Sequence, residues 1–179
     1  MTLEVVPVWK QVTPEIRDEL VEFWTRHKAI GDEASQAARA EQAVCIGRTG
    51  DGAIWGVGTA VVRVLPRLRQ PMYFYRQFFA PEHRGQKQTV PFFNQVKAVL
   101  QAHNQSLPQP ESLGVLVELE NQMLSQRYVE AYGSESGTTF IGYSPRGLQL
   151  RVAYFDGARL MPPVALPRVA RPVRGARRA

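Results

Sequence analysis

The sequence contains very little cysteine and no long apolar run. Cys45 is the single cysteine among 179 residues, so the chain forms no internal disulfide bond. The longest uncharged apolar stretch, residues 53–62, falls well short of the ~20 residues that a membrane-spanning helix needs. The N-terminal residues lack the basic and apolar regions of a secretory signal, and three scattered histidines beside one cysteine give no metal-ligand spacing. We therefore expect a cytoplasmic protein with no membrane partner and no structural metal.

The composition is that of a folded domain followed by a basic tail. Hydrophobic residues make up 44% of the chain and charged residues 21%, which is typical of a globular protein, and the length suits one domain. The net charge of +6 is uneven, because six of the 22 basic residues and none of the 16 acidic ones lie from Arg159 onward. Four prolines in that segment prevent a continuous helix. We predict a neutral folded domain over residues 1–158 and a Pro/Arg-rich tail over residues 159–179 that is disordered and contacts polyanions weakly.

Hydrophobic periodicity predicts an α/β domain with the order β-α-α-β-β-β-α-β-α-β-β. The expected strands are residues 3–10, 43–48, 53–65, 72–80, 114–119, 138–143 and 148–155, and the expected helices are residues 14–27, 33–42, 90–104 and 121–132. Thr13, Asp32 and Thr89 are the expected helix N-caps. The second and third strands flank a Thr-Gly-Asp-Gly turn and should pair as an antiparallel hairpin. The later β-α-β crossover should make one pair of strands parallel, so we expect a mixed sheet.

The segment FFAPEHRGQKQT, residues 78–89, joins an aromatic strand to a helix. A short turn at a helix N-terminus exposes free backbone N–H groups, which suit a pyrophosphate. Together with the element order, two short motifs resemble the GNAT superfamily of N-acyltransferases: Phe79-Ala80-Pro81 and Arg84-Gly85. The match to the acyl-CoA-binding loop of that superfamily is incomplete, because Lys87 and Thr89 stand where the superfamily has small residues. The alternative is an ordinary solvated turn. The resemblance implies a GNAT-like, mostly antiparallel sheet of about seven strands with helices on both faces. It also implies acetyl-CoA or another acyl-CoA as co-substrate, held by Phe78, Phe79, Arg84, Gly85, Gln86, Lys87, Gln88 and Thr89.

The second motif, VELENQMLSQRYVEAYG, covers residues 117–133. Asn121 and Tyr128 are seven residues apart, close to two helical turns. The resemblance implies that Asn121 starts a helix beside the cofactor and that Tyr128 protonates the departing thiolate. Tyr132 is the alternative acid if the register differs, and a core aromatic is the alternative role of Tyr128.

Glu118 and Glu120 are the candidate general bases. They share one face of a strand by its period of two and lie at the strand's C-terminal end, where α/β sheets place ligands. The alternative is that both face solvent or pair with arginines.

Two further features of the sequence are expected to have mainly structural roles. The aromatic run over residues 73–79 is expected to form core and cleft wall. The basic residues between positions 63 and 97 either receive phosphates or form a solvated face, and Cys45 is expected to be buried.

The function implied by the resemblance is acyl-CoA-dependent N-acyl transfer. Acetyl transfer to an amine of a small molecule or peptide, by direct attack in a ternary complex, is the leading hypothesis. A catalytically weak GNAT-like binding module whose basic tail engages a polyanion is the alternative. The oligomeric state is left open between monomer and homodimer.

Overall fold

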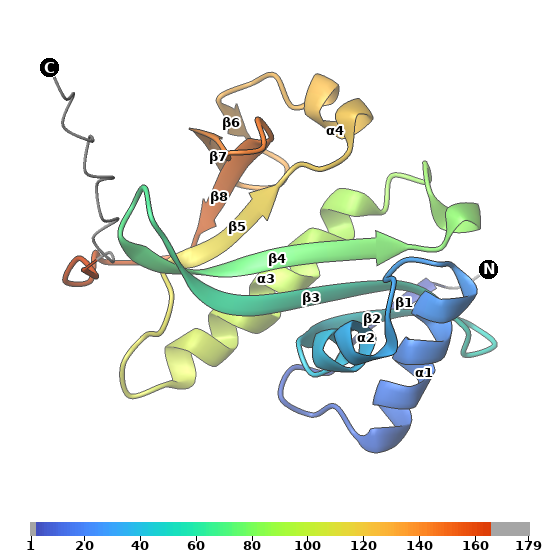
Figure 1. Cartoon of the computed structure of the whole chain (residues 1–179). Helices are drawn as coiled ribbons and strands as arrows, with labels where there is room; N and C mark the ends of the chain where they lie inside the picture. Colours follow the sequence, from blue (N-terminus) through green and yellow to red (C-terminus); the bar gives the residue numbers. More distant parts are fainter. Residues whose placement is uncertain (1–2, 166–179) are drawn as a thin grey trace, which may run out of the picture.

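The computed structural model describes residues 3–165. The described part of the chain contains eight strands, four α-helices and one short 3-10 turn, η1 (Figure 1). The strands are β1 (Leu3–Pro7), β2 (Ala43–Thr49), β3 (Ile54–Leu65), β4 (Gln70–Phe79), β5 (Gly114–Glu118), β6 (Tyr132–Gly133), β7 (Thr138–Tyr143) and β8 (Gln149–Tyr154). The helices are α1 (Pro14–Arg26), α2 (Glu33–Ala40), α3 (Thr89–Ser106) and α4 (Gln122–Arg127), with η1 at Pro81–His83. The predicted order is confirmed, with the two-residue strand β6 added.

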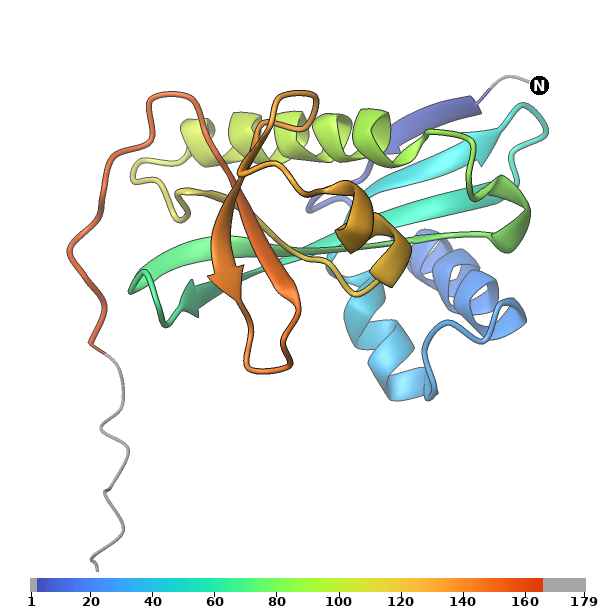
Figure 2. The same ribbon diagram turned by 90° about the horizontal axis from the view of Figure 1, so that it is seen from above.

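All eight strands form one sheet in the order β1-β2-β3-β4-β5-β8-β7-β6. Every pairing is antiparallel except that of β4 with β5, which the crossover through α3 makes parallel. Helix α3 covers one face of the sheet, and α1 and α2 cover the other (Figure 2). The mixed, mostly antiparallel sheet with helices on both faces is therefore confirmed.

Two of the three expected helix caps are confirmed. Oγ1 of Thr13 accepts the N–H of Ile16 at 3.3 Å, and Oδ1 of Asp32 accepts the N–H of Ser35 at 2.8 Å. The third expectation is wrong, because Gln88 occupies the N-cap of α3 without a side-chain hydrogen bond and Thr89 is the first helical residue. Gln88 already has helical backbone angles, with φ −78° and ψ −15°, so the helical turn begins before the threonine. The first N–H groups of α3 therefore lack a side-chain acceptor.

The helix expected over residues 121–132 is much shorter. Helix α4 ends at Arg127, and Tyr128 leaves the helical region with ψ 66°. Side chains of β8 bind the carbonyls that a longer helix would use: Gln149 Nε2 donates to the carbonyl of Tyr128 at 3.2 Å, and Arg151 Nη2 donates to that of Glu130 at 2.8 Å. Tertiary hydrogen bonds thus end the helix.

The aromatic run of β4 contributes to the core on both faces of the sheet, as expected. Because successive side chains of a strand point to opposite faces, Tyr73, Tyr75 and Phe79 pack with α3, in a cluster that includes Phe92 and Val96. We call this side the α3 face. On the other side, here the α1/α2 face, Phe78 packs with the cluster of α1, and Phe74 packs with Leu116 and Val152.

Cys45 is buried, as expected. It belongs to the cluster of the α3 face, and burial raises the pKa of its thiol to about 12. The thiol therefore stays protonated and unreactive at neutral pH.

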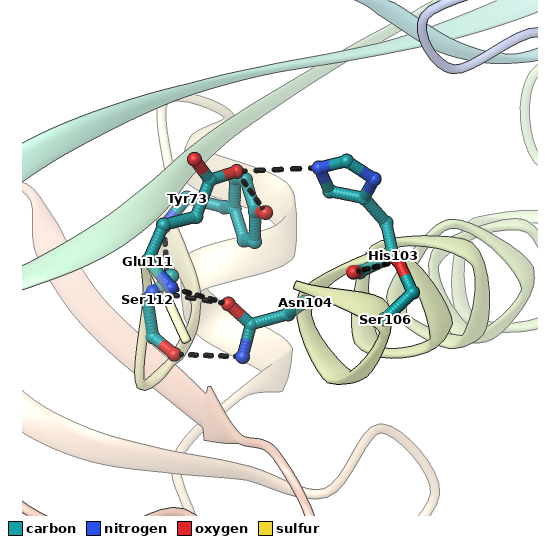
Figure 3. Close-up of polar contacts among 6 residues, drawn as sticks. All are labelled: Tyr73, His103, Asn104, Ser106, Glu111 and Ser112. Atoms are coloured by element: carbon teal, nitrogen blue, oxygen red, sulfur yellow. Dashed lines mark hydrogen bonds and ion pairs between the residues drawn. The ribbon is translucent and has the colours of Figure 1, made fainter. Parts of the chain in front are cut away.

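A polar cluster joins β4 to the start of β5 (Figure 3). Asn104 of α3 accepts the N–H groups of Glu111 and Ser112 at 2.9 and 3.1 Å and donates to the carbonyl of Ser112 at 3.1 Å. Ser112 Oγ accepts the N–H of Tyr73 at 3.1 Å, and the Tyr73 hydroxyl donates to Glu111 at 2.5 Å. His103 Nε2 lies 3.5 Å from the same carboxylate. These contacts hold β4 and β5 together at one end.

The first residues of the expected tail lie against the domain. The N–H of Val164 donates to the carbonyl of Arg69 at 3.0 Å, and Gln70 exchanges two hydrogen bonds with the backbone of Met161 at 2.8 and 2.9 Å. Residues 166–179, which hold five of the six tail arginines, lie outside the described residues. Disorder and polyanion contact of the tail therefore stay predictions. No helix between residues 3 and 165 is long and apolar enough to cross a membrane.

Candidate functional site

The parallel strands β4 and β5 separate at one end. Their pairing runs from Tyr73 with Val115 to Tyr75 with Val117. Beyond this point β4 continues to Phe79, paired with β3 alone, while β5 ends at Glu118 (Figure 1). The edge of β4 that faced β5 is consequently open over its last four residues.

The backbone of Gln77 and Phe79 faces this open edge. Strand backbone groups alternate in direction, and the N–H of Ala80 donates to the carbonyl of Trp55 in β3 at 2.9 Å. Phe78 and Arg76 therefore pair with β3, whereas Gln77 and Phe79 point away from it. We expected the backbone around Phe78 and Phe79 to be the exposed part. The register instead turns the backbone of Phe79 and Gln77 toward the open edge, where Arg84 occupies the carbonyl of Phe79. Sequence patterning missed Gln77.

The loop from Ala80 to Gln88 returns the chain to α3. Gly85 and Lys87 both adopt the left-handed backbone conformation, with φ +77° and +58°. Lys87 thus has the backbone shape that a glycine takes most easily, although it adds a side chain. No backbone N–H of residues 85–90 donates a hydrogen bond to another described residue. These groups and the positive end of the α3 dipole form an anion-binding arrangement.

Arg84 braces the loop against the end of β4. Its Nε donates to the carbonyl of Phe79 at 3.0 Å, and its guanidinium lies 5.1 Å from the ring centre of Phe78. Gln86 Nε2 closes the turn by donating to the carbonyl of Glu82 at 3.1 Å. The side chains of Lys87 and Arg84 are exposed beside the free N–H groups.

Tyr128 lies immediately after α4 and lines a cavity of about 340 Å³. Asn121 and Tyr128 do not project from one helix as expected, because α4 ends one residue earlier. The amide of Asn121 caps α4, accepting the N–H groups of Met123 and Leu124 at 2.9 and 3.4 Å. Burial and the nearby charge of Glu135 raise the pKa of Tyr128, against the opposing charge of Arg151. The phenol is therefore protonated at neutral pH, as a proton donor must be.

Arg151 supports the Tyr128 side of the cavity. Only 2% of Arg151 is exposed, and its guanidinium lies 5.6 Å from the Tyr128 ring centre. Its hydrogen bonds go to uncharged oxygens, among them Thr138 Oγ1 at 3.2 Å and the carbonyl of Glu130 at 2.8 Å. Arg151 pairs with Val117 of β5, so it lies on the α3 face, and Tyr128 lies there with it.

Glu118 and Glu120 are brought together by one arginine. Arg146, in the turn between β7 and β8, donates from Nη2 to Glu118 at 2.7 Å and to Glu120 at 2.8 Å. Glu118 follows Leu116 by two residues and therefore lies on the α1/α2 face, opposite Tyr128. Burial raises the pKa of Glu118, but hydrogen bonds from Arg146 and Ser144 and the charges of Arg146 and Arg76 outweigh it and lower the pKa. Pairing with an arginine, the alternative to a role as general base, is thus observed, and the sequence did not identify which arginine.

The basic series between positions 63 and 97 does not form one surface. Arg67 donates to the carbonyls of Ile141 and Tyr143 at 2.6 and 3.1 Å, and Arg69 donates to that of Val164 at 3.0 Å. Arg84 and Lys87 belong to the loop on the α3 side. Among residues 3–165, no group of three or more His, Cys, Asp or Glu side chains could hold a metal ion.

Comparisons with known proteins identify the fold. No protein-family model and no curated protein matches the sequence. An acetyltransferase of the GNAT family from Streptococcus pneumoniae superposes with a TM-score of 0.58 at 13% identity, covering 86% of this chain and 99% of that one. A GNAT-family acetyltransferase from Staphylococcus aureus gives 0.53 at 12%, covering 86% and 99%. The spermidine N-acetyltransferase of Vibrio cholerae gives 0.53 at 11%, covering 86% and 92%.

Proposed function

We propose, from the premise that this chain has the GNAT acetyltransferase fold, that it is an acyl-CoA-dependent N-acyltransferase that transfers an acetyl group to an amine. Fold alone does not fix activity, so the proposal depends on the site. The observation that supports it most is the open edge of β4 leading into a loop with free N–H groups at the start of α3.

These features suit the two polar parts of an acyl-CoA molecule. The pantetheine arm is an amide chain. The backbone of Gln77 and the N–H of Phe79 offer it strand-like hydrogen bonds, whereas the carbonyl of Phe79 already accepts from Arg84. The pyrophosphate would be held by the N–H groups of residues 85–90, with Lys87 and Arg84 contributing charge. A Cβ on Gly85 would meet nothing within 4 Å, so the loop leaves space on this side.

The place where β4 and β5 separate is called the split below. The reaction would need a proton donor and a proton acceptor on opposite sides of it. The amine nitrogen forms a bond to the acyl carbon while the carbon–sulfur bond breaks. The amine gives a proton to a carboxylate, and the thiolate takes a proton from Tyr128. Tyr128 lies on the α3 face and Glu118 and Glu120 on the α1/α2 face, which suits a donor and an acceptor that approach from different sides.

Glu120 is the better placed of the two candidate bases. Arg146 holds both carboxylates, but the pKa of Glu118 is lowered, which makes Glu118 a weaker base. The side chain of Glu120 is 57% exposed and that of Glu118 is 26% exposed. An incoming amine therefore reaches Glu120 more easily, directly or through one water.

Binding of acetyl-CoA tests the proposal directly. Ligand at 100 times its dissociation constant should stabilise the fold by about 2.7 kcal/mol and raise the melting temperature by about 5 to 11 °C. Gly85→Glu places bulk and negative charge in the loop and should abolish the rise. Gly52→Glu is the matched control, because Gly52 also has a positive φ, +88°, and open space around it, but lies in the β2–β3 turn.

The alternative is a GNAT-like binding module that has lost catalysis. Lys87 and Thr89 at positions that are small in active loops favour it, as does the charge of the tail. If acetyl-, succinyl- and longer acyl-CoA all leave the melting temperature unchanged at millimolar concentration, the binding module becomes the better interpretation. Deleting residues 166–179 should then abolish salt-sensitive retention on a polyanion column without changing the melting temperature.

A further inference from the structure

Three arginines lie on the α1/α2 face of the sheet. Arg63 is opposite Met72, and Arg76 is opposite Thr59. Cross-strand partners share a face, so both arginines lie on the side of Phe74 and Phe78. Arg39 belongs to helix α2, which covers this face (Figure 2). Burial and the charges of Arg76 and Arg63 lower the pKa of its guanidinium, against the opposing charge of Glu120. We call Arg39, Arg63 and Arg76 the arginine cluster.

The arginine cluster has no carboxylate of its own. No ion pair among the described residues involves any of its three members, whereas Arg146 takes both Glu118 and Glu120. Counting Arg146, four guanidinium groups lie on the same face as these two carboxylates. Like charges repel one another, so this face of the folded chain carries an excess of positive charge.

Resting on the proposed acyltransferase function, we propose that the acceptor is an amine that also carries an anionic group, a carboxylate or a phosphate, and that the arginine cluster binds this group. The β7–β8 turn with Arg146 and helix α2 with Arg39 flank β3 and β4 on this face (Figure 2). The acceptor's anionic group would occupy the cluster while its amine reaches Glu120.

The charges on the α1/α2 face favour this class of acceptor over a cationic one. Guanidinium groups bind carboxylate and phosphate through two parallel hydrogen bonds, which also fixes orientation. A polyamine would place further positive charge against three unpaired arginines and would be rejected. A neutral amine would leave the cluster's repulsion in place.

Matched pairs of acceptors test the proposal by turnover. With acetyl-CoA saturating, α-amino acids are compared with their amides, and aminoalkyl phosphates with the corresponding amino alcohols, and a polyamine is added. We expect the anionic member of at least one pair to have kcat/KM at least about 10-fold higher. Arg63→Gln should remove that preference through KM, and Arg17→Gln, an equal charge change on α1, should retain it. Equal rates for the members of every pair, or faster polyamine acetylation, would overturn the proposal.

Anion binding tests the cluster without turnover. The protein is first saturated with CoA, so that the α3 loop is occupied, and then titrated with succinate or inorganic phosphate. At ten times the dissociation constant of the anion, the melting temperature should rise by about 3 to 6 °C. The double variant Arg63→Gln/Arg76→Gln should lose this rise and Arg17→Gln should keep it. Succinate alone or phosphate alone producing the rise identifies the preferred group.

The proposal of an anionic acceptor and the proposal of acyl-CoA binding can be contradicted by different results. If acetyl-CoA binds but neither anion produces a cluster-dependent rise, the anionic acceptor is wrong and acyl-CoA binding stands. If acetyl-CoA does not bind, both proposals fall. Without ligand, Arg63→Gln should raise the melting temperature at low salt by about 1 to 2 °C, because it relieves repulsion. A fall instead would show that Arg63 has a structural role and would contradict an unpaired cluster.

Discussion

The two faces of the sheet present different chemical groups beside the split between β4 and β5. On the α3 face, the site consists of backbone N–H groups, the half-buried phenol of Tyr128 and the buried guanidinium of Arg151. On the α1/α2 face it consists of exposed charged side chains around Glu118 and Glu120. Strand β4 borders both sets, because the side chains of its neighbouring residues Arg76 and Gln77 point to opposite faces. The proposed proton donor and the proposed proton acceptors thus lie on opposite faces of one sheet.

The largest effect is expected for the proposed proton donor on the α3 face. Tyr128→Phe keeps the ring but removes the proton, so turnover should fall by about 10²- to 10⁴-fold with little change in acetyl-CoA affinity. Tyr132→Phe, in the exposed strand β6, is the control. If only Tyr132→Phe lowers kcat, the acid has been assigned to the wrong tyrosine.

The next test is on the opposite face. Glu120→Gln should lower kcat by about 10²-fold, and Glu118→Gln should lower it less, because the Glu118 side chain is less exposed to an incoming amine. Neither substitution should change the thermal shift with acetyl-CoA. A loss of that shift would mean that the carboxylates belong to the donor side.

Two substitutions of Lys87 distinguish the effect of its charge from that of its strained backbone conformation. Lys87→Gly removes a left-handed non-glycine residue, which costs about 1 kcal/mol or more, and should raise the melting temperature by about 2 to 4 °C. Lys87→Gln keeps the strain and removes the charge, so it should weaken acetyl-CoA binding and reduce its salt dependence. Equal acetyl-CoA affinities in the wild type and Lys87→Gln would exclude a phosphate contact.

The smallest effect concerns Arg146 and pH. The pKa of Glu118 in the folded chain lies below its ordinary value of 4.5, so its ion pair stabilises the fold above that value, and this stabilisation is lost as the pH falls through the lowered pKa. Arg146→Gln should therefore melt about 1 to 3 °C below the wild type at pH 6. The two curves should converge in acid, and a gap that persists at pH 2 would assign Arg146 a role independent of Glu118.

The sequence predicted the order of helices and strands better than the side-chain contacts of the candidate site. Local signals sufficed for Thr13, Asp32 and the Thr-Gly-Asp-Gly hairpin, because a cap or a turn involves residues a few positions apart. The end of α4 was missed because Gln149 and Arg151, more than twenty positions away, bind the carbonyls that would continue the helix.

The charged side of the site was unpredictable for the same reason. Nothing in the sequence connects Arg146 with Glu118, or Arg39 of α2 with Arg76 of β4, since both associations arise from the folding of the sheet. Strand periodicity pointed to both carboxylates, but β5 ends at Glu118 and Glu120 follows it, so the hydrogen bonds of Arg146 and not a shared strand face bring the two together. Gln77 required the register of β3 with β4, which a pattern of apolar residues does not fix to one position.

Strand β4 is fixed to Ser112 at one end and has one unpaired edge at the other, so its amides should exchange hydrogen at uneven rates. The N–H of Tyr73 is bound by Ser112 Oγ, and those of Arg76 and Phe78 pair with β3, so all three should exchange slowly. The amides of Gln77 and Phe79 face the open edge and should exchange fast. An acyl-CoA arm lying along that edge would slow these two amides and leave Arg76 and Phe78 unchanged, which gives a footprint with a period of two residues.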